Sequence, residues 1–554
     1  MSAESGTANE GERFVMTVVP SIAVSQDTRK SISILIFSAL FMAGAYFHQP
    51  VDYDNTSSRY FLVSAVVDRG TLSIDENEKE TIDKSFYNGH YYSNKAIGAP
   101  LLGVPVYWIT RHLPFLKDSP PLSPSSKYIV RLFTTTLPFA LLGVVMFWLA
   151  CSAGASVRNS FLMVVAYSFG TISLIHSTLF SGHQIAASFL FFSFALVCCL
   201  AGRVDEPCRF SRPVVLFLSG LFAGFAAITD YPAVIIVFLL TVYVLSLRLP
   251  FRNVLIFISG GMTCAGLVAV YNILCFDNPI SLSYSHLSFE KFRDEATSGL
   301  FGINLPRFGT LTALLFSPAR GIFIIMPVLL LALAGLGEMI AGEKNRREAF
   351  FIIAVCIAYV FFNSGYSGWH GGWTFGPRYL VPMLPFLAFA IAFCRLNSFS
   401  FFLLFLLSAF QILPAVVGMP HAPEGVRNPL VEIIIPCIGQ GYLARNAGML
   451  FGLPGLLSVV PVALVIGYLL LITNKKTKRM SAGEDGRGRA MPRFIVYAWL
   501  IVVIGLLGFT STTPEKMIHA YRWRLLCHAG WILKSPELMK ASEIEAALAG
   551  DLLR

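Results

Sequence analysis

The sequence predicts an all-α integral membrane protein with about thirteen membrane-spanning helices and a large helical first outer loop. Of its 554 residues, 55% are hydrophobic and only 13% are charged, whereas soluble proteins carry about 25% charged residues. Apolar stretches of roughly 20 residues, the length that crosses a bilayer, recur from Ser31 to near Thr510. The partner implied by this composition is the lipid bilayer, and a large soluble domain is excluded.

The predicted spans divide the chain into three parts. Residues 1–30 form a cytoplasmic tail, residues 31–511 form the membrane domain, and residues 512–554 form a short extracytoplasmic tail. By the length rule for helices the spans are 31–47, 128–150, 158–175, 184–202, 213–229, 232–248, 253–273, 320–340, 349–364, 378–395, 398–418, 450–473 and 493–511.

Basic residues orient this topology. If the N-terminus is cytoplasmic, the cytoplasmic segments collect lysines and arginines, among them Lys344, Arg346 and Arg347. The two shortest outer loops, 176–183 and 230–231, contain none. The net charge of +10 is therefore explained by the positive-inside bias, and nucleic acid is not a predicted partner. An odd number of spans places the C-terminus outside, and the predicted location is a bacterial inner membrane.

The first outer loop, residues 48–127, is the longest polar stretch between predicted spans. Its segment from Ala96 to Thr110 is apolar but short, and it contains Pro100 and Pro105. Counting this segment as a span would move a basic cytoplasmic loop outside. We therefore predict an interfacial or re-entrant piece, within a loop of short helices that the two prolines interrupt.

Unusual polar residues gather on the predicted outer side. Charged side chains at a membrane edge are costly unless they are paired or used, so a converging set predicts a site. The neighbouring aromatic residues offer flat apolar surfaces with polar rims, which suit sugar rings or lipid head groups. The candidates are Asp52, Asp54, Arg59, Tyr60, Asp83, His90, Tyr92, Lys95, His176, His183, Asp230, Arg320, Trp369, Trp373 and Arg378.

Each candidate also has a structural interpretation. Asp52 and Asp54 suit the N-terminus of a loop helix, and Lys95 and Arg378 suit basic side chains that reach lipid phosphates. His176 and His183 suit interfacial positions without a ligand. The segment Asp230-Tyr231-Pro232 suits a turn between two spans. The case for a site depends on the convergence of these residues.

The layout of residues 30–420 resembles the GT-C superfamily of polyprenol-dependent glycosyltransferases, especially its aminoarabinose transferase and protein O-mannosyltransferase branches. Those enzymes have acidic residues in the first outer loop, then an Arg-Tyr pair, then a Tyr-x-Lys-Pro-Pro-Leu-like stretch. Asp52-Tyr53-Asp54, Arg59-Tyr60 and the segment from Tyr92 to Leu101 take the corresponding places. Two departures are Ala96-Ile97 in place of the double proline and Asn55 in place of an acid.

The resemblance implies transfer of a sugar from a polyprenyl-phosphate donor to an extracytoplasmic acceptor of the cell envelope, by an inverting displacement. It implies a carboxylate that deprotonates the acceptor, with Asp54 as the first choice and Asp52 or Asp83 as substitutes. It implies cations that hold the phosphate, namely Lys95, Arg320 and Arg378. Arg59, Tyr60, His90, Tyr92, His183 and Asp230 complete the predicted substrate-binding set. A divalent cation between Asp52 and Asp54 is the open alternative to metal-free chemistry.

The alternative function is a transporter or lipid flippase of the envelope. That function predicts charges in the middle of the membrane and interrupted helices in related halves of the chain. Most of the predicted spans are free of charged residues, and a transporter has no evident use for the long first outer loop.

Overall fold

The structure is a computed structural model, and it describes residues 26–49, 52–202, 211–395, 397–424, 426–480 and 492–507. Helices dominate these ranges, which confirms the all-α prediction. The predicted tail 512–554, most of the predicted tail 1–30 and the predicted cytoplasmic segment 203–210 lie outside the described residues.

Eight helices in the described ranges are long and apolar enough to cross a membrane. Some are continuous runs of two or three shorter helical elements. They are α1 (Gln26–Tyr46), α4 (Pro124–Arg131) with η3 (Leu132–Thr136) and α5 (Leu137–Ser152), α8 (Gly182–Leu200), α9 (Arg212–Thr229), α11 (Phe251–Phe276), α16 (Arg346–Gly365), α18 (Ser398–Val417), and η10 (Gly455–Val459) with α21 (Val460–Met480).

Shorter helices occupy the remaining predicted spans. Proline lies inside or at the start of several of them, where the missing N–H and the ring interrupt regular helix. They are α6 (Val157–Gly170), η4 (Tyr231–Ala233) with α10 (Val234–Ser246), η6 (Pro327–Leu329) with α15 (Leu330–Ala341), η7 (Arg378–Met383) with α17 (Leu384–Phe389) and η8 (Ala390–Phe393), and α22 (Arg493–Leu507). A further apolar pair, η9 (Leu430–Ile434) with α19 (Ile435–Gly439), was not predicted as a span.

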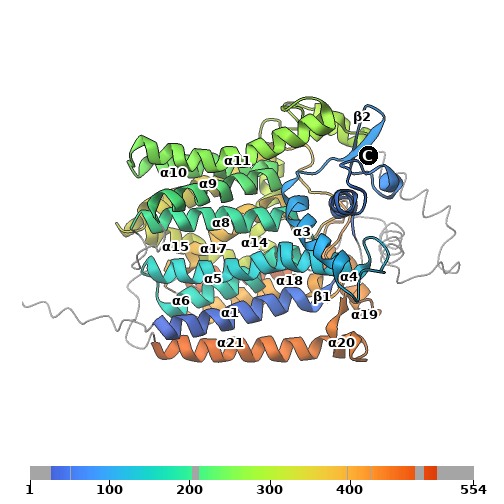
Figure 1. Cartoon of the computed structure of the whole chain (residues 1–554). Helices are drawn as coiled ribbons and strands as arrows, with labels where there is room; N and C mark the ends of the chain where they lie inside the picture. Colours follow the sequence, from blue (N-terminus) through green and yellow to red (C-terminus); the bar gives the residue numbers. More distant parts are fainter. Residues whose placement is uncertain are drawn as a thin grey trace, which may run out of the picture.

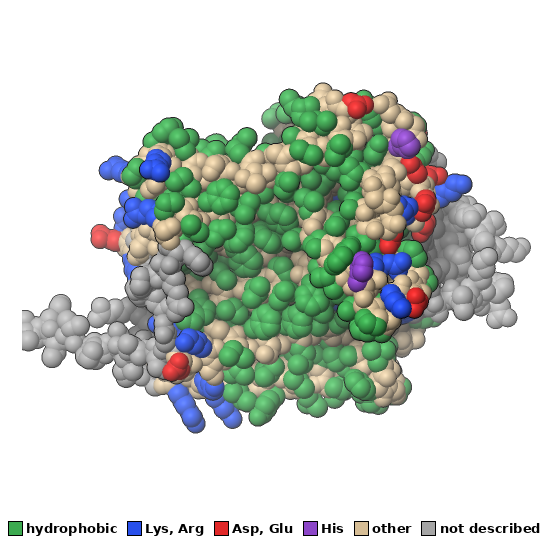
Figure 2. Space-filling model, viewed as in Figure 1, with side chains coloured by type: hydrophobic (Ala, Val, Ile, Leu, Met, Phe, Trp, Pro, Cys, Tyr) green, Lys and Arg blue, Asp and Glu red, His purple; other side chains and the backbone are tan. Residues whose placement is uncertain are grey.

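The long helices lie side by side as a bundle, and the first outer loop caps one end of it (Figure 1). On the face shown in Figure 2, hydrophobic side chains form a broad band across the middle of the molecule. Lysine and arginine are visible at both ends of this face, whereas the acidic and histidine side chains lie mainly at the loop end. This distribution is that of a protein that spans a bilayer.

The first outer loop contains a β-hairpin as well as helices. Its elements are α2 (Asp54–Ser64), η1 (Ala65–Arg69), η2 (Asp75–Glu80), β2 (Lys84–Tyr87), β3 (His90–Ser93) and α3 (Gly98–His112). The hairpin turn is Asn88-Gly89, and both residues have positive φ, at 48° and 85°. This pair is the one that two-residue hairpin turns favour, so residues 84–93 form a hairpin where short helices were predicted.

The segment around Pro105 also differs from its prediction. Helix α3 runs without interruption for 15 residues, with Pro100 near its start and Pro105 inside it. Pro105 removes one backbone donor, but the rest of the helix holds. At 1.5 Å per residue, α3 is about 22 Å long, which is shorter than the hydrocarbon core of a bilayer.

Smaller elements connect the bundle and complete the loop end. They are β1 (Phe47–His48), α7 (Ser173–Ser177), η5 (Ser283–His286), α12 (Glu290–Thr297), α13 (Phe308–Phe316), α14 (Ile322–Ile325), β4 (Arg445–Asn446) and α20 (Ala447–Leu450). Strands β1 and β4 pair antiparallel. The first helix and α21 lie side by side (Figure 1), and the Tyr46 hydroxyl donates to the Ser458 carbonyl at 2.6 Å.

Helices α9 and α11 approach until their backbones touch. A Cβ atom on Gly220 would lie 1.8 Å from the Phe257 carbonyl oxygen, and one on Gly260 would lie 2.2 Å from the Phe217 carbonyl oxygen. Small residues permit such contact between membrane helices. Thr229, the last residue of α9, lines the cavity described below.

The predicted orientation is testable by cysteine labelling in intact cells. Lys117 lies after α3 at the loop end, and Lys344 lies in the turn between α15 and α16; both are exposed. We expect Lys117→Cys to react with a membrane-impermeant maleimide in intact cells. We expect Lys344→Cys to react only after permeabilisation. Labelling of the unmodified chain is measured in parallel and subtracted. The reverse pattern would show that the predicted orientation is wrong.

Candidate functional site

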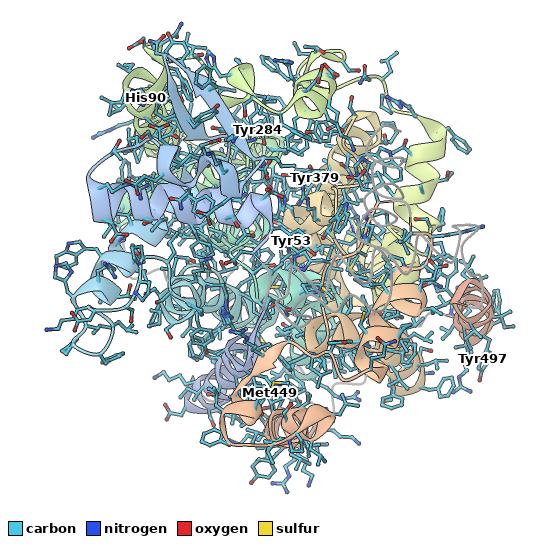
Figure 3. All side chains as sticks on the ribbon, turned by 90° about the vertical axis from the view of Figure 1, so that its right-hand side faces the viewer. Tyr53, His90, Tyr284, Tyr379, Met449 and Tyr497 are labelled. Atoms are coloured by element: carbon cyan, nitrogen blue, oxygen red, sulfur yellow. The ribbon has the colours of Figure 1, made fainter. Side chains whose placement is uncertain are left out.

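A cavity of about 490 Å³ lies between the first outer loop and the ends of the membrane helices. Seen from the loop end, Tyr284 and Tyr379 of its wall lie near each other in the upper half of the molecule, above Tyr53 (Figure 3). The wall combines polar side chains from distant segments between Asn55 and Tyr379 with aromatic and aliphatic ones. Its polar members are Asn55, Arg59, Asp83, Asn94, Lys95, His183, Thr229, Asp230, Tyr231, Tyr284, Glu295, Tyr366, Arg378 and Tyr379.

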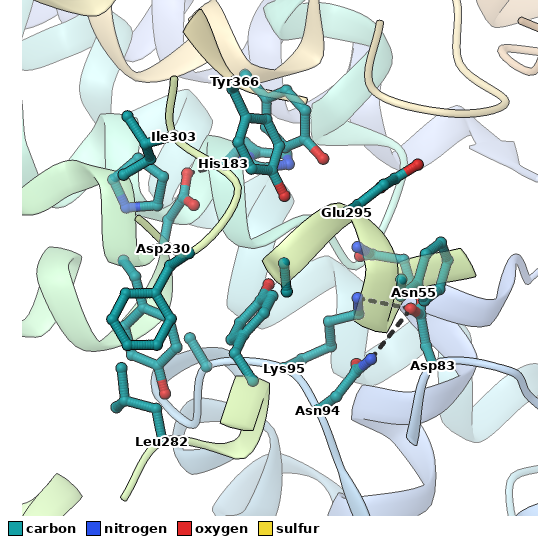
Figure 4. Close-up of a pocket in the computed structure, with 18 of the residues that line it drawn as sticks. Asn55, Asp83, Asn94, Lys95, His183, Asp230, Leu282, Glu295, Ile303 and Tyr366 are labelled. Atoms are coloured by element: carbon teal, nitrogen blue, oxygen red, sulfur yellow. Dashed lines mark hydrogen bonds and ion pairs between the residues drawn. The ribbon is translucent and has the colours of Figure 1, made fainter. Parts of the chain in front are cut away.

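One polar group is centred on Asp83, which precedes strand β2. Lys95 Nζ lies 2.8 Å from Asp83 Oδ1, and Asn94 Nδ2 donates to the same oxygen at 3.3 Å (Figure 4). Both charged residues are buried. The hairpin brings them together, because β3 leads directly into Asn94 and Lys95. Burial lowers the pKa of Lys95, and the Asp83 carboxylate opposes this shift.

Two arginines that line the cavity have N–H groups without a hydrogen-bond acceptor in the described part of the chain. Arg59 is buried on α2, and Arg378 opens η7. Within the described part of the chain, neither guanidinium lies within 4.0 Å of a carboxylate oxygen. The Nε–H of each is buried and has no hydrogen-bond acceptor there. Burial lowers the pKa of Arg59 to about 10, while Asp230 raises it, so this arginine stays charged at neutral pH. Such donors suit an anionic ligand.

A second acid–base pair joins α8 to the end of α9. His183 Nδ1 lies 2.7 Å from Asp230 Oδ2, and both side chains are about one-tenth exposed. Asp230 ends α9 with extended backbone angles, so the turn predicted for Asp230-Tyr231-Pro232 is present. In Figure 4 the His183–Asp230 pair and the Asp83–Lys95 pair lie on different sides of the cavity.

Some apolar side chains of the cavity wall are exposed on the outside of the helix bundle. Val234 and Phe301 line the cavity and are 57% and 56% exposed. Tyr366 and Tyr379 stack edge to face inside it, with ring centroids 5.5 Å apart. The cavity therefore offers a charged interior and an apolar exit at the level of the membrane helices.

Two predicted acids point elsewhere. Asp54 starts α2, and its Oδ1 accepts a hydrogen bond from the Ile82 backbone N–H at 2.9 Å. Asp52 Oδ2 lies 2.6 Å from Lys127 Nζ. Neither acid is part of the cavity wall. Of the three predicted carboxylates, Asp83 alone lies in that wall.

Four residues of the predicted phosphate- and substrate-binding set also lie outside the cavity wall. Arg320 is 2% exposed, and its guanidinium donates to the carbonyls of Ala319, His370 and Gly372, so it fixes the loop that precedes Arg378. Three first-loop residues have contacts of their own. Tyr60 donates to the Lys127 carbonyl, His90 pairs with Asp75, and Tyr92 packs on Phe276.

Sequence reasoning did not select Glu295 or Tyr284, which the structure places in the cavity wall. Both lie in the long polar segment between α11 and α13. Burial raises the pKa of Glu295, and nearby Lys291 lowers it. The length of this outer segment was the available signal, because a chain of that length can fold back over the site.

No group of three or more His, Cys, Asp or Glu residues in the described ranges is arranged to hold a metal ion. Asp52 and Asp54, the predicted alternative for a cation, have the separate contacts given above.

Comparisons with known proteins complete the description. No family model matches the sequence, and no curated protein sequence matches it. Two solved structures are similar to this fold. ArnT from Cupriavidus metallidurans bound to undecaprenyl phosphate has a TM-score of 0.41 at 15% identity, covering 86% of this chain and 77% of that one. ArnT from the same organism in the apo state has a TM-score of 0.43 at 16% identity, covering 86% and 76%.

Proposed function

We propose that this chain is a membrane glycosyltransferase that moves a sugar from a polyprenyl-phosphate donor to an envelope acceptor. The observation that carries the proposal is the cavity that joins Arg59, Lys95 and Arg378 to a carboxylate, Asp83, and to an apolar exit. A lipid-linked sugar phosphate needs cations for its phosphate, a base for its acceptor and an apolar path for its tail. The first-loop resemblance points to the same chemistry.

In the proposed reaction, Asp83 takes the proton from the acceptor hydroxyl or amine. The acceptor oxygen or nitrogen forms a bond to the anomeric carbon, and the bond from that carbon to the phosphate oxygen breaks. The electron pair leaves with the polyprenyl phosphate, whose growing negative charge Arg59 and Arg378 stabilise. Lys95, 2.8 Å from Asp83, pairs with the base and adds positive charge to the cavity.

The direct test is turnover of the purified full-length chain in lipid nanodiscs. A panel of polyprenyl-phosphate sugars is incubated with envelope acceptors, and release of polyprenyl phosphate is measured. We expect release with at least one donor, and loss of release in Asp83→Asn by about a hundredfold to ten-thousandfold. The protein is also reconstituted into vesicles of the same lipid composition. Translocation of the lipid across the vesicle membrane without release of polyprenyl phosphate would instead support the flippase alternative.

Asp54 provides a contrasting prediction. Because its carboxylate accepts one hydrogen bond from the Ile82 N–H, Asp54→Ala should lower the free energy of unfolding by about 1 kcal/mol. We expect turnover of this variant to stay within about threefold of the original chain, because one modest hydrogen bond is lost outside the cavity. Folded Asp54→Ala protein that has lost turnover a hundredfold would return the role of base to Asp54.

A further inference from the structure

The His183–Asp230 pair is the second acid–base group of the cavity, and the proposed reaction does not yet use it. His183 Nδ1 faces the Asp230 carboxylate at 2.7 Å. Its other ring nitrogen, Nε2, is buried and has no hydrogen-bond partner among the residues that the structure describes, although the residue lines the cavity. A buried ring nitrogen without a partner is costly, and it is explained if a ligand supplies the partner.

The surroundings of His183 indicate which part of a ligand that is. Its ring contacts Tyr379 edge to face at 5.4 Å between centroids, and the Arg378 guanidinium lies 5.2 Å from the same Tyr379 ring. Arg59 also approaches from α2, since its Nη2 would lie 3.0 Å from a Cβ on Gly182. His183 therefore lies on the side of the cavity where the two arginines have unused donors.

We propose that His183, in its imidazolium form, donates a hydrogen bond from Nε2 to the leaving phosphate, and that Asp230 is its positioning residue. Asp230 accepts from Nδ1–H, which directs Nε2 into the cavity and balances the imidazolium charge. This inference rests on the proposed function. An inverting displacement has its base and its leaving group on opposite faces of the sugar, and the Asp83 and His183 pairs lie on different sides of the cavity (Figure 4).

The proposal implies that phosphate binding weakens as the imidazole loses its proton. The charged and titratable groups that face His183 are Asp230 from the end of α9, His176 from α7, Arg59 from α2, and Arg378 and Tyr379 from η7. The phosphate itself also titrates near pH 6. We therefore compare the affinity of the original chain with that of a His183 variant at each pH. The titration of the ligand affects both affinities equally, so it cancels in their ratio.

The experiment measures binding of polyprenyl monophosphate to the full-length chain in nanodiscs from pH 5.5 to 8.5. His183→Gln keeps an amide donor but cannot be charged. We expect the original chain to bind at least tenfold more tightly than His183→Gln at pH 5.5, and the ratio to approach 1 at pH 8.5. The exposed His112 supplies the matched control, and His112→Gln should keep the pH dependence of the original chain.

Asp230→Asn provides a second variant if His183→Gln does not fold. It should move the loss of affinity to lower pH, whereas a purely structural role would lower thermal stability and leave the pH dependence unchanged. A ratio that is constant with pH in folded variants overturns the role of His183. Failure of the original chain to bind polyprenyl phosphate at any pH overturns the proposed function as well, so the two failures are distinguishable.

Discussion

Replacement of Lys95 by methionine is expected to reduce turnover roughly 30- to 4,000-fold. This range corresponds to the 2–5 kcal/mol that truncation of one partner of a buried, hydrogen-bonded charge pair costs. Lys95 Nζ lies 2.8 Å from Asp83 Oδ1, and both side chains are close to one-tenth exposed. Without Lys95 the buried Asp83 carboxylate loses its charged partner, and the cavity loses a cation. The measurement is release of polyprenyl phosphate at saturating donor.

Two further variants separate chemistry from folding in this prediction. Asp83→Asn combined with Lys95→Met removes both buried charges, so thermal stability should recover while turnover stays lost. Lys84, on strand β2 of the same hairpin, is the matched control, because it pairs with Glu78 of η2 and lies outside the cavity wall. Lys84→Met should keep turnover within about threefold. Normal turnover in folded Lys95→Met would exclude Lys95 from the reaction.

Replacement of Gly220 by valine is expected to have the largest effect on folding. A Cβ there would lie 1.8 Å from the Phe257 carbonyl oxygen, a backbone atom that cannot rotate away. Helices α9 and α11 would have to separate, and overpacking of this kind costs about 1–3 kcal/mol, occasionally more. The measurement is the yield of monodisperse protein and its thermal midpoint in detergent.

Gly266, on α11, the helix that packs against α9, is the control for the Gly220 variant. A Cβ at Gly266 would meet nothing within 4 Å, so Gly266→Val should fold with nearly unchanged thermal stability. If both valine variants lose stability equally, the intrinsic effect of a β-branched residue explains the loss, and the contact with Phe257 does not.

The membrane helices were predictable because apolar runs of the required length are a property of local sequence. The hairpin also had a local signal, since Asn88-Gly89 lies between Tyr87 and His90-Tyr91. This signal was not used, because the first outer loop was predicted to form short helices. The course of α3 through Pro105 was not predictable from the proline alone, because neighbouring turns and packing decide whether a helix continues.

The candidate site was predictable only in part. Lys95, His183, Asp230 and Arg378 were selected as unusual polar residues at the predicted outer side, and the structure brings them to one cavity. Which of Asp52, Asp54 and Asp83 enters that cavity depends on the direction of each side chain at the start of α2 and β2. Glu295 and Tyr284 come from a segment about two hundred residues further along the chain, and no local pattern connects them to the first loop.

The contact between α1 and α21 has a consequence for biosynthesis. The Tyr46 hydroxyl and the Ser458 carbonyl are separated by 412 residues, and Lys476 Nζ reaches Ser31 Oγ at 2.7 Å. A ribosome that adds 5–20 residues per second needs roughly 20 to 80 seconds to make that length. During this interval the first helix lies in the bilayer without α21, the helix that it finally packs against. The early helices must therefore rely on lipid, on one another or on an insertion chaperone to shield Tyr46 until translation is nearly complete.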